Sequence, residues 1–366
     1  MANIEAAETG PLGMHGASVL PEVEVDTYNE ELRDADGFLG DRASKRAFNA
    51  IVDDWRTRLA KIDEDPLGDT PTEELGKKGL DKALQSEEPE VAALVHAAIE
   101  EFGGELATVI RRFLRLKAWQ GTERIVVGGG FSHSRVGALS VARAGLLLKA
   151  EGTEIGLDLI AHHPDEAGLI GALHLFPAWA FAGHDAILAV DIGGSNIRGG
   201  IVRFELAKGQ VKSGRVEAFD LWRHCEDKPK RDEAVERLIT MLEKMTARAK
   251  REGLHLAPFI GIGCPGIIDP DGAIERGGQN LPGNWESSRF NLPREIRKAI
   301  PRIEGHETVV LMHNDAVVQG LSELPRVREV ERWGVLTIGT GLGNARFTRR
   351  APEEKPKEKE KEKEKS

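Results

Sequence analysis

The stretch that decides the fold of this chain is 186–196, which reads AILAVDIGGSN. Its beginning is apolar without interruption, which is typical of a strand buried on both faces of a sheet. That strand runs into Asp191 and then into a glycine pair, Gly193 and Gly194, which predicts a tight turn. A second apolar stretch, 199–204, follows at once. The sequence therefore predicts a β-hairpin whose glycine-rich tip begins with a carboxylate.

Two more glycine-rich turns follow short apolar strands. One is 128–130 (GGG) after the strand 124–127, and the other is 339–343 (GTGLG) after the strand 335–338. Glycine lets backbone N–H groups approach an anion closely, although each turn alone could be an ordinary tight turn. The sequence contains neither a Walker loop nor a dinucleotide-binding glycine pattern after a strand. Together the turns predict a phosphate site of another type.

Two carboxylates are candidates for chemistry. Asp315 follows the expected strand 309–312 and opens a helix, so it is either a helix cap or a general base that accepts a hydroxyl proton. Asp191 is poorly suited to touch a phosphate directly, but it could hold Mg²⁺ directly or through water. The residues alone leave these alternatives open.

Helical and strand patterns alternate along the chain, which predicts α/β architecture. In the helix expected at 43–62, Ala47, Ile51, Trp55 and Leu59 recur every four residues, which predicts that they share the buried face. The other expected helices are 89–119, 135–150, 165–180, 230–252 and 316–324, and the other strands are 155–160 and 259–264.

Composition limits the function classes. The chain has 366 residues, is 40% hydrophobic and carries a formal net charge of −10, which argues against nucleic-acid binding. Its two cysteines, Cys225 and Cys264, favour a reducing cytoplasm over a disulfide framework. We expect neither a signal peptide nor a membrane span. The Lys/Glu tail, 351–366, has no apolar face and is expected to be disordered.

The motifs, taken in order, resemble those of ROK (repressor, open reading frame, kinase) sugar kinases of the actin-like ATPase superfamily. The resemblance implies an α/β, two-lobed actin-like (ribonuclease H-like) fold and a glucokinase-like, ATP-dependent phosphorylation of a hexose-like sugar. The matching segments are 191–196, 262–267 (IGCPGI), 280–283 (NLPG), 314–315 and 339–343.

The order of the segments indicates a circular permutation. Segments 125–132 (IVVGGGFS) and 165–172 (DEAGLIGA) resemble parts of the C-terminal half of the family, but here they lie at the front, with a junction near 183–184. The resemblance thus implies a nucleotide-side lobe of 1–184 plus 333–350. It implies a sugar-side lobe of 185–332 that carries the catalytic Asp315.

The resemblance also implies roles for individual residues. Asp315 would be the general base, and Asp191 would hold Mg²⁺ indirectly. ATP would be bound by Asp191, Gly193, Gly194, Ser195, Asn196, Thr340, Gly341, Gly343, Gly129 and Gly130. The sugar would be contacted by Asn280, Asn314 and Gly266.

The sequence departs from the family at two places. The cysteine cluster of the family's zinc site is missing, so we expect no structural zinc. The sugar clamp is incomplete: Glu8, His15 or Asp41 could replace it, and the identity of the sugar stays open. The expected partners are a sugar and ATP, without nucleic acid or membrane, and a homodimer is one option for the assembly. The alternatives are a non-catalytic sugar sensor without a DNA-binding domain and a filament or chaperone ATPase.

Overall fold

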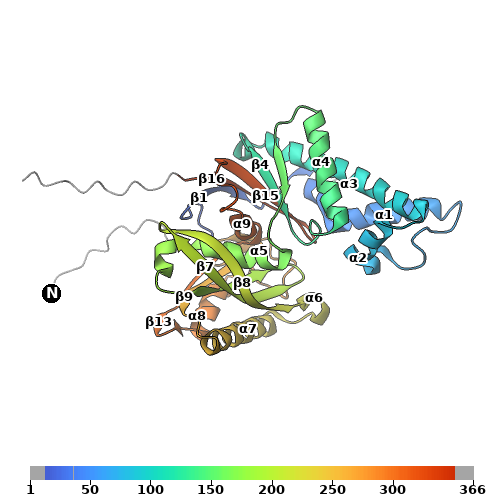
Figure 1. The fold of residues 1–366 in the computed structure, drawn as a ribbon. Coiled ribbons are helices and arrows are strands. Elements are labelled where there is room, and N and C mark those ends of the chain that lie inside the picture. The colour runs from blue at the N-terminus through green and yellow to red at the C-terminus, as the bar shows by residue number, and fades with distance from the viewer. Residues whose placement is uncertain (1–12, 36, 351–366) are drawn as a thin grey trace, which may run out of the picture.

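The structure, a computed structural model, describes residues 13–35 and 37–350 and is built around two five-stranded sheets (Figure 1). The tail 351–366 and Glu8 lie outside the described residues. Sheet 1 contains, in spatial order, β1 (Val23–Tyr28), β16 (Leu342–Arg349), β15 (Arg332–Ile338), β4 (Arg124–Gly128) and β5 (Gly156–Leu159). Sheet 2 contains β14 (Val309–Asn314), β9 (Leu256–Cys264), β6 (Ala186–Ile192), β7 (Ile197–Ala207) and β8 (Gln210–Trp222). The minor hairpins pair β2 (Arg33–Asp34) with β3 (Gly37–Phe38), β10 (Ile267–Ile268) with β11 (Ile274–Arg276), and β12 (Arg302–Ile303) with β13 (His306–Glu307).

The two sheets have the same plan. In sheet 2, β6, β7 and β8 form an antiparallel meander, and β9 and β14 add in parallel on the other side of β6. In sheet 1, β15, β16 and β1 form the meander, and β4 and β5 add in parallel beside β15. The strands of sheet 2 all come from one continuous segment, 186–314, whereas those of sheet 1 come from two segments, 23–159 and 332–349. The fold is therefore mixed α/β, as the sequence predicts, and its two sheets share one strand plan, which the sequence did not reveal.

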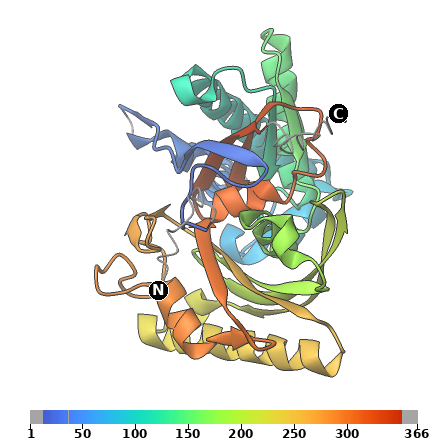
Figure 2. The same cartoon turned by 90° about the vertical axis from the view of Figure 1, so that its left-hand side faces the viewer.

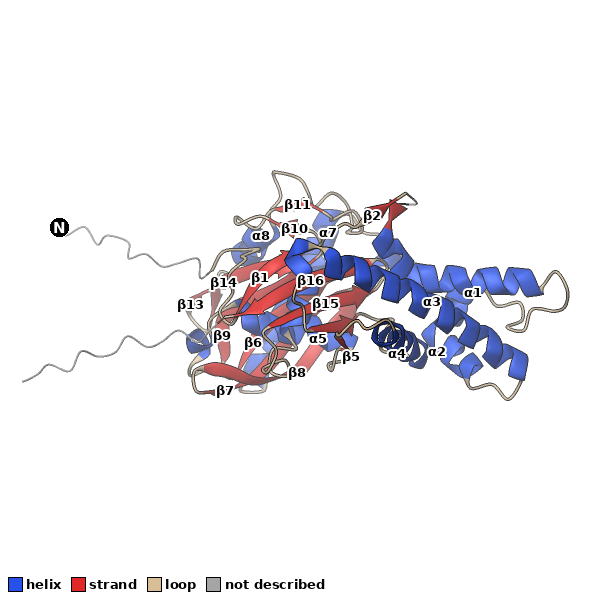
Figure 3. Ribbon diagram, turned by 90° about the horizontal axis from the view of Figure 1, so that it is seen from above, coloured by secondary structure: helices blue, strands red, loops and turns tan. Residues whose placement is uncertain are grey.

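The longer helices cover the outer faces of the sheets (Figures 1 and 3). Sheet 1 carries α1 (Lys45–Leu59), α2 (Thr72–Leu84), α3 (Pro89–Arg115) and α4 (Arg135–Ala150), and sheet 2 carries α7 (Arg231–Arg251) and α8 (Leu292–Ala299). A short helix, α6 (His224–Asp227), follows β8. Among the described residues, 13–35 and 37–350, no helix combines the length and hydrophobicity that crossing a membrane requires.

Two short helices, α5 (Pro164–Gly171) and α9 (Asp315–Leu321), lie between the sheets near the centre of the molecule (Figures 1 and 2). They pack closely, because a Cβ added at Gly171 would lie 1.7 Å from the carbonyl oxygen of Val318. One hydrophobic cluster joins residues of both helices to both sheets. The two sheets can therefore move relative to one another only if these two helices move as well.

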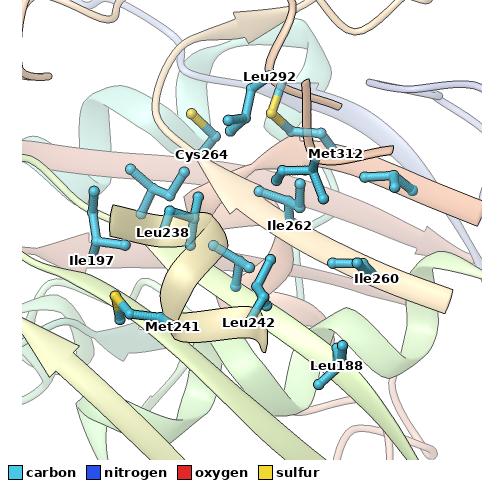
Figure 4. Packing of buried hydrophobic residues seen from close by; sticks show 14 of the residues in the cluster. Leu188, Ile197, Leu238, Met241, Leu242, Ile260, Ile262, Cys264, Leu292 and Met312 are labelled. Carbon is cyan, nitrogen blue, oxygen red and sulfur yellow. The ribbon is translucent and has the colours of Figure 1, made fainter. Parts of the chain in front are cut away.

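Separate cores lie on the outer face of each sheet. Beneath sheet 2, strand residues such as Leu188 and Ile262 interlock with Leu238 and Met241 of α7 (Figure 4). The helices α1 to α4 form another core with the outer face of sheet 1. Buried apolar area of this kind contributes about 25 cal/mol per Å² and fixes the strand ends that carry the glycine turns.

The structure corrects some of the sequence-based expectations. The face of α1 that is fully buried carries Phe48, Val52 and Arg56, whereas the predicted face, one residue earlier at each turn, is only partly buried. The expected helix 165–180 ends at Gly171 and continues as 3-10 turns. The strands 210–222 and 342–349 were not expected at all, because their mixed composition hides them from a hydrophobic pattern.

Candidate functional site

Asp191 ends up buried at the carboxyl end of β6, where Arg198 neutralises it. The Arg198 Nη1 donates to Asp191 Oδ2 at 2.9 Å, and its Nε and Nη2 donate to Asp165 Oδ1 at 2.9 and 2.7 Å. Burial raises the pKa of Asp191, while Arg198 opposes that shift. Neither Arg198 nor Asp165 was singled out from the sequence. The hairpin register could have revealed Arg198, because it pairs directly with Asp191 across β6 and β7.

Asp315 is the first residue of α9 and directly follows β14. The cap of this helix is Asn314, whose Oδ1 accepts from the backbone N–H of Ala316 at 3.0 Å and of Val317 at 3.3 Å. Asp315 is therefore not needed as the helix cap. Burial, and next the nearby Asp191, raise the pKa of Asp315 to about 7. Such a carboxyl group can accept a proton near neutral pH.

The two carboxylates flank the same glycine of β9. A Cβ built at Gly263 would lie 3.6 Å from Asp191 Oδ1 and 3.6 Å from the Cα of Asp315. Because β6, β9 and β14 are parallel neighbours, their carboxyl ends share one edge of sheet 2. This edge holds the predicted base and the predicted Mg²⁺-side carboxylate together.

The first glycine turn, 191–196, crosses toward the other sheet. Gly193 N donates to Asn196 O at 2.8 Å, which closes the turn, and the His224 Nε2 lies 2.9 Å from Gly193 O. The Ser195 hydroxyl oxygen lies 3.4 Å from that of Thr340. The glycine turns of sheets 2 and 1 therefore meet.

The second turn, 339–343, rests on the start of α1. Lys45 N donates to Gly339 O at 3.0 Å, and Arg46 Nε donates to Thr340 O at 3.1 Å. Gly343 has a packing role, because an added Cβ would lie 2.4 Å from the Thr337 hydroxyl oxygen. By contrast, an added Cβ at Gly341 would meet no atom within 4 Å. That open face is where a ligand could approach.

The third turn, 128–130, lies against the second. Gly129 has φ +85°, and an added Cβ would lie 2.4 Å from the carbonyl oxygen of Ile338, so only glycine fits this close approach. The Lys77 Nζ of α2 donates to Gly130 O at 2.8 Å. The chain thus brings all the predicted glycine turns together, and adds two basic side chains, Lys77 and Arg46, that sequence reasoning missed.

The residues present fit a nucleotide phosphate chain. The Cα faces of Gly339 and Gly341 are open enough to form a cradle that any side chain would fill. Asp191 Oδ1 is buried and has no hydrogen-bond partner among the described residues, so a Mg²⁺-bound water could satisfy it. Within 13–35 and 37–350, no three His, Cys, Asp or Glu side chains form a metal cluster. Mg²⁺ with phosphates needs only one or two protein carboxylates.

The residues predicted to contact a sugar differ in burial and in the hydrogen bonds that they form. Asn280 is exposed beside the first turn, where an added Cβ on Gly194 would lie 3.0 Å from the Asn280 Cβ. Asn314 is buried, and its side-chain amide donates to Gly266 O at 3.0 Å. This hydrogen bond connects the end of β14 to the loop that follows β9. His15 accepts from Met312 N at 3.1 Å, and Asp41 pairs with Arg46. A direct sugar contact by any of these remains a prediction.

Comparison with known proteins gives limited overlap. No protein-family model matches the sequence, and no curated protein is similar to it. A putative sugar kinase from Cytophaga hutchinsonii is 20% identical and has a TM-score of 0.33, over 44% of this chain and 47% of that one. The ROK hexokinase from Thermus thermophilus is 23% identical with a TM-score of 0.31, over 43% and 45% of the chains.

A third solved structure is a putative N-acetylmannosamine kinase from Listeria monocytogenes, 23% identical with a TM-score of 0.31, over 44% and 47% of the chains. The chain therefore spans about half the length of each of these structures. Sugar kinases, one of them of the ROK type, are among the structures that this chain resembles.

Proposed function

We propose that this protein transfers a phosphoryl group from ATP to a hydroxyl of a hexose-like sugar, with Asp315 as the general base. The observation that carries the proposal is the convergence of the glycine turns 191–196, 339–343 and 128–130 beside Asp191 and Asp315. Glycine turns suit phosphates, and a carboxylate with a pKa near neutrality suits the activation of a hydroxyl group.

In this mechanism the carboxylate of Asp315 accepts the proton of the sugar hydroxyl group as the hydroxyl oxygen attacks the γ-phosphorus of ATP. The bond between the γ-phosphorus and the bridging oxygen breaks, and ADP leaves with that oxygen. Arg198 holds Asp191 Oδ2, so that Oδ1 keeps its place beside Gly263. Mg²⁺, when bound near Asp191, would neutralise charge on the phosphates. The N–H groups of Gly194, Ser195, Thr340 and Gly341 would position the phosphate chain, while those of Gly193 and Gly339 close their own turns. Most of the rate enhancement then comes from positioning and charge neutralisation.

We also propose that the chain is a circular permutant of a two-lobed kinase, with lobes of 1–184 plus 333–350 and of 185–332. The shared strand plan supports it, since the meander of sheet 1 starts with β15 and β16 and resumes at β1. The two parts meet directly, because Arg350 N donates to Glu22 O at 3.1 Å. The division is not strict, since α5 precedes residue 184 but packs on β6, β7, β8 and β9 of sheet 2, and α9 lies within 185–332 but also packs on β15 and β16 of sheet 1.

The test is a coupled assay for ADP release with purified full-length chain, Mg²⁺ and ATP, run with and without a panel of hexoses and N-acetylhexosamines. We expect turnover that depends on one or a few sugars, with the sugar phosphate identified by mass spectrometry. ATP hydrolysis independent of sugar would point to a filament or chaperone ATPase. Sugar binding without turnover would point to a sensor. Either result would overturn the proposal.

The matched control is Asp315→Asn, which keeps the size of the side chain but removes the proton acceptor. It should lose sugar-dependent turnover while its affinity for ATP, measured by calorimetry, stays the same. Unchanged turnover would remove Asp315 from the role of base.

A further inference from the structure

A solvent-open pocket of about 580 Å³ lies along the outer edge of β14, and it is distinct from the candidate active site. It is lined by Thr308, which directly precedes β14, and by Val309 to Leu311 in the first half of that strand, whereas Asp315 follows the end of the strand. At about 3.3 Å per residue, Thr308 and Asp315 are roughly 20 Å apart along the strand. Pockets that hold small molecules have volumes of roughly 300–1,000 Å³.

Two arginines give the pocket its charge. Arg297, in the last turn of α8, and Arg302, on β12, both line it and are exposed. Neither forms an ion pair with another residue in the described part of the chain. Glu307 is the acidic side chain that lines the pocket, so two guanidinium groups face one carboxylate. Guanidinium groups match phosphate oxygens in geometry as well as in charge.

A buried hydroxyl group in the wall lacks a partner. Thr308 is 3% exposed, and its Oγ1 has no hydrogen-bond partner among the residues that the structure describes. Its backbone is held in place, because Thr308 N donates to Pro301 O at 3.0 Å. Leaving a buried hydroxyl group unpaired costs about 1–3 kcal/mol, so a rotation of the Thr308 side chain that brings its hydroxyl group to a ligand oxygen in the pocket would remove a penalty.

The opposite wall is fixed to the edge of β14. The His15 Nδ1 accepts from Met312 N at 3.1 Å, and Gly16 N donates to Met312 O at 3.0 Å. Because the Nδ1 of His15 is the acceptor, its ring proton is on Nε2. Gly13 and His15 therefore form a wall with backbone anchors, and the pocket does not depend on long surface side chains alone.

We propose that this pocket is a second ligand site that binds a small phosphate monoester. Arg297 and Arg302 hold the phosphate oxygens, and the Thr308 hydroxyl group donates to one of them. The ester-linked remainder of the ligand lies against Val310 and Leu311 of β14. None of its residues belongs to the glycine turns or to the carboxylate pair, and the variants that test it leave His15, a candidate for the sugar clamp, unchanged.

The test is isothermal titration of the full-length protein with glycerol 3-phosphate, with inorganic phosphate and with neutral glycerol. Glycerol 3-phosphate should bind at one site per chain, inorganic phosphate more weakly, and glycerol not at all. The double variant Arg297→Gln/Arg302→Gln should bind glycerol 3-phosphate at least about ten-fold more weakly, and Thr308→Val several-fold more weakly. The double arginine variant should keep the melting temperature of the wild type, because both arginines are exposed, and Thr308→Val should raise it, because an unpaired buried hydroxyl group is removed.

The matched control, Arg289→Gln/Arg294→Gln, removes the same charge from exposed positions that do not line the pocket, and it should bind like wild type. Asp315→Asn should also bind like wild type, so failure of the proposed kinase reaction leaves this test intact. Equal affinity in the pocket variant and in the control would overturn the proposal. The absence of saturable binding of glycerol 3-phosphate would also overturn the proposal. If inorganic phosphate binds as tightly as glycerol 3-phosphate, a phosphate monoester is rejected as the ligand.

Discussion

The hydroxyl oxygens of Ser195 and Thr340 lie 3.4 Å apart, although Ser195 belongs to a turn of sheet 2 and Thr340 to a turn of sheet 1. Each turn connects strands of its own sheet. The contact between Ser195 and Thr340 therefore joins the two sheets at the candidate phosphate site. A ligand held by both turns would depend on the spacing of the sheets. Movement of one sheet against the other could then open and close the site.

The open face of Gly341 gives the sharpest test of the phosphate site. Gly341→Ala should fold normally, since an added Cβ meets no atom within 4 Å, but the methyl group would occupy the place of a phosphate oxygen. We expect the KM for ATP to rise by about ten-fold or more, with the KM for the sugar nearly unchanged. Gly104→Ala, at an open position inside α3, is the control and should slightly stabilise the protein.

The pKa of Asp315 predicts how the reaction depends on pH. With a pKa of about 7 in the ligand-free protein, the carboxyl group becomes a base as pH rises, so kcat/KM for the sugar should increase between about pH 6 and pH 8 with a midpoint near 7. A flat profile across this range would contradict the assignment. Asp315→Asn should lower kcat by about 10²–10⁴-fold and remove this limb of the profile.

The same shift predicts the pH dependence of stability. The folded-state pKa of Asp315 lies above its ordinary value of 3.8, so the folded protein holds the proton more tightly than the unfolded chain. Its contribution to stability is therefore largest at low pH and is lost as pH rises from about 4 to about 7. Urea denaturation at both ends of this window should show that Asp315→Asn gains stability relative to wild type at pH 7. No relative gain would argue that Asp315 is ionised without penalty.

Arg198 should be a structural requirement of the site. Arg198→Met would leave Asp191 and Asp165 close together without their shared cation, and removing one partner of a buried ion pair costs about 3–5 kcal/mol. Chemical denaturation measures this loss. Asp165→Asn is the milder companion, because Arg198 would still pair with Asp191. Equal stability of Arg198→Met and wild type would show that the pair is not maintained in solution.

Lys77 is predicted to assist nucleotide binding. Lys77→Met should raise the KM for ATP about five-fold, as expected when roughly 1 kcal/mol is lost at an exposed site, with little change in the KM for the sugar. The neighbouring exposed residue supplies the control, since Lys78→Met has no contact with the glycine turns. If both variants behave alike, Lys77 acts only through general surface charge.

Reordering the chain tests the permutation. A gene that starts at residue 185, runs to 350, continues through a flexible linker into residue 13 and ends at 184 should fold with similar circular dichroism and retain sugar-dependent activity. The physical reason is that every strand pair of both sheets is kept. Gly183 is a suitable cut site, because it has φ +83° and no atom lies near its Cα face. Failure to fold, with a linker long enough to span the ends, would count against the permutation.

The sequence alone predicts the strands whose residues are uniformly apolar, such as 186–190, and the helix 135–150, because burial on both faces or along one stripe leaves a simple pattern. It also singles out the glycine turns and the two carboxylates that the fold brings together, since their chemistry is local, and their roles in binding and catalysis stay predictions. It fails for β8 and β16, which lie in mixed sequence, and for the buried face of α1. There Arg56 is buried because it donates to Asp65, Gly68, Thr70 and Thr72, which lie beyond the helix.

Only the tertiary structure decides how the parts combine. The pairing of β1 with β16, the contact between Ser195 and Thr340 and the shared partner Arg198 of Asp191 and Asp165 join segments that are distant in the chain. The pKa of Asp315 is set in the same way, by burial under α5 and β9 and by a neighbouring carboxylate. Local sequence determines what each segment can form, but a pairing or a desolvation energy exists only when the distant partner is in place.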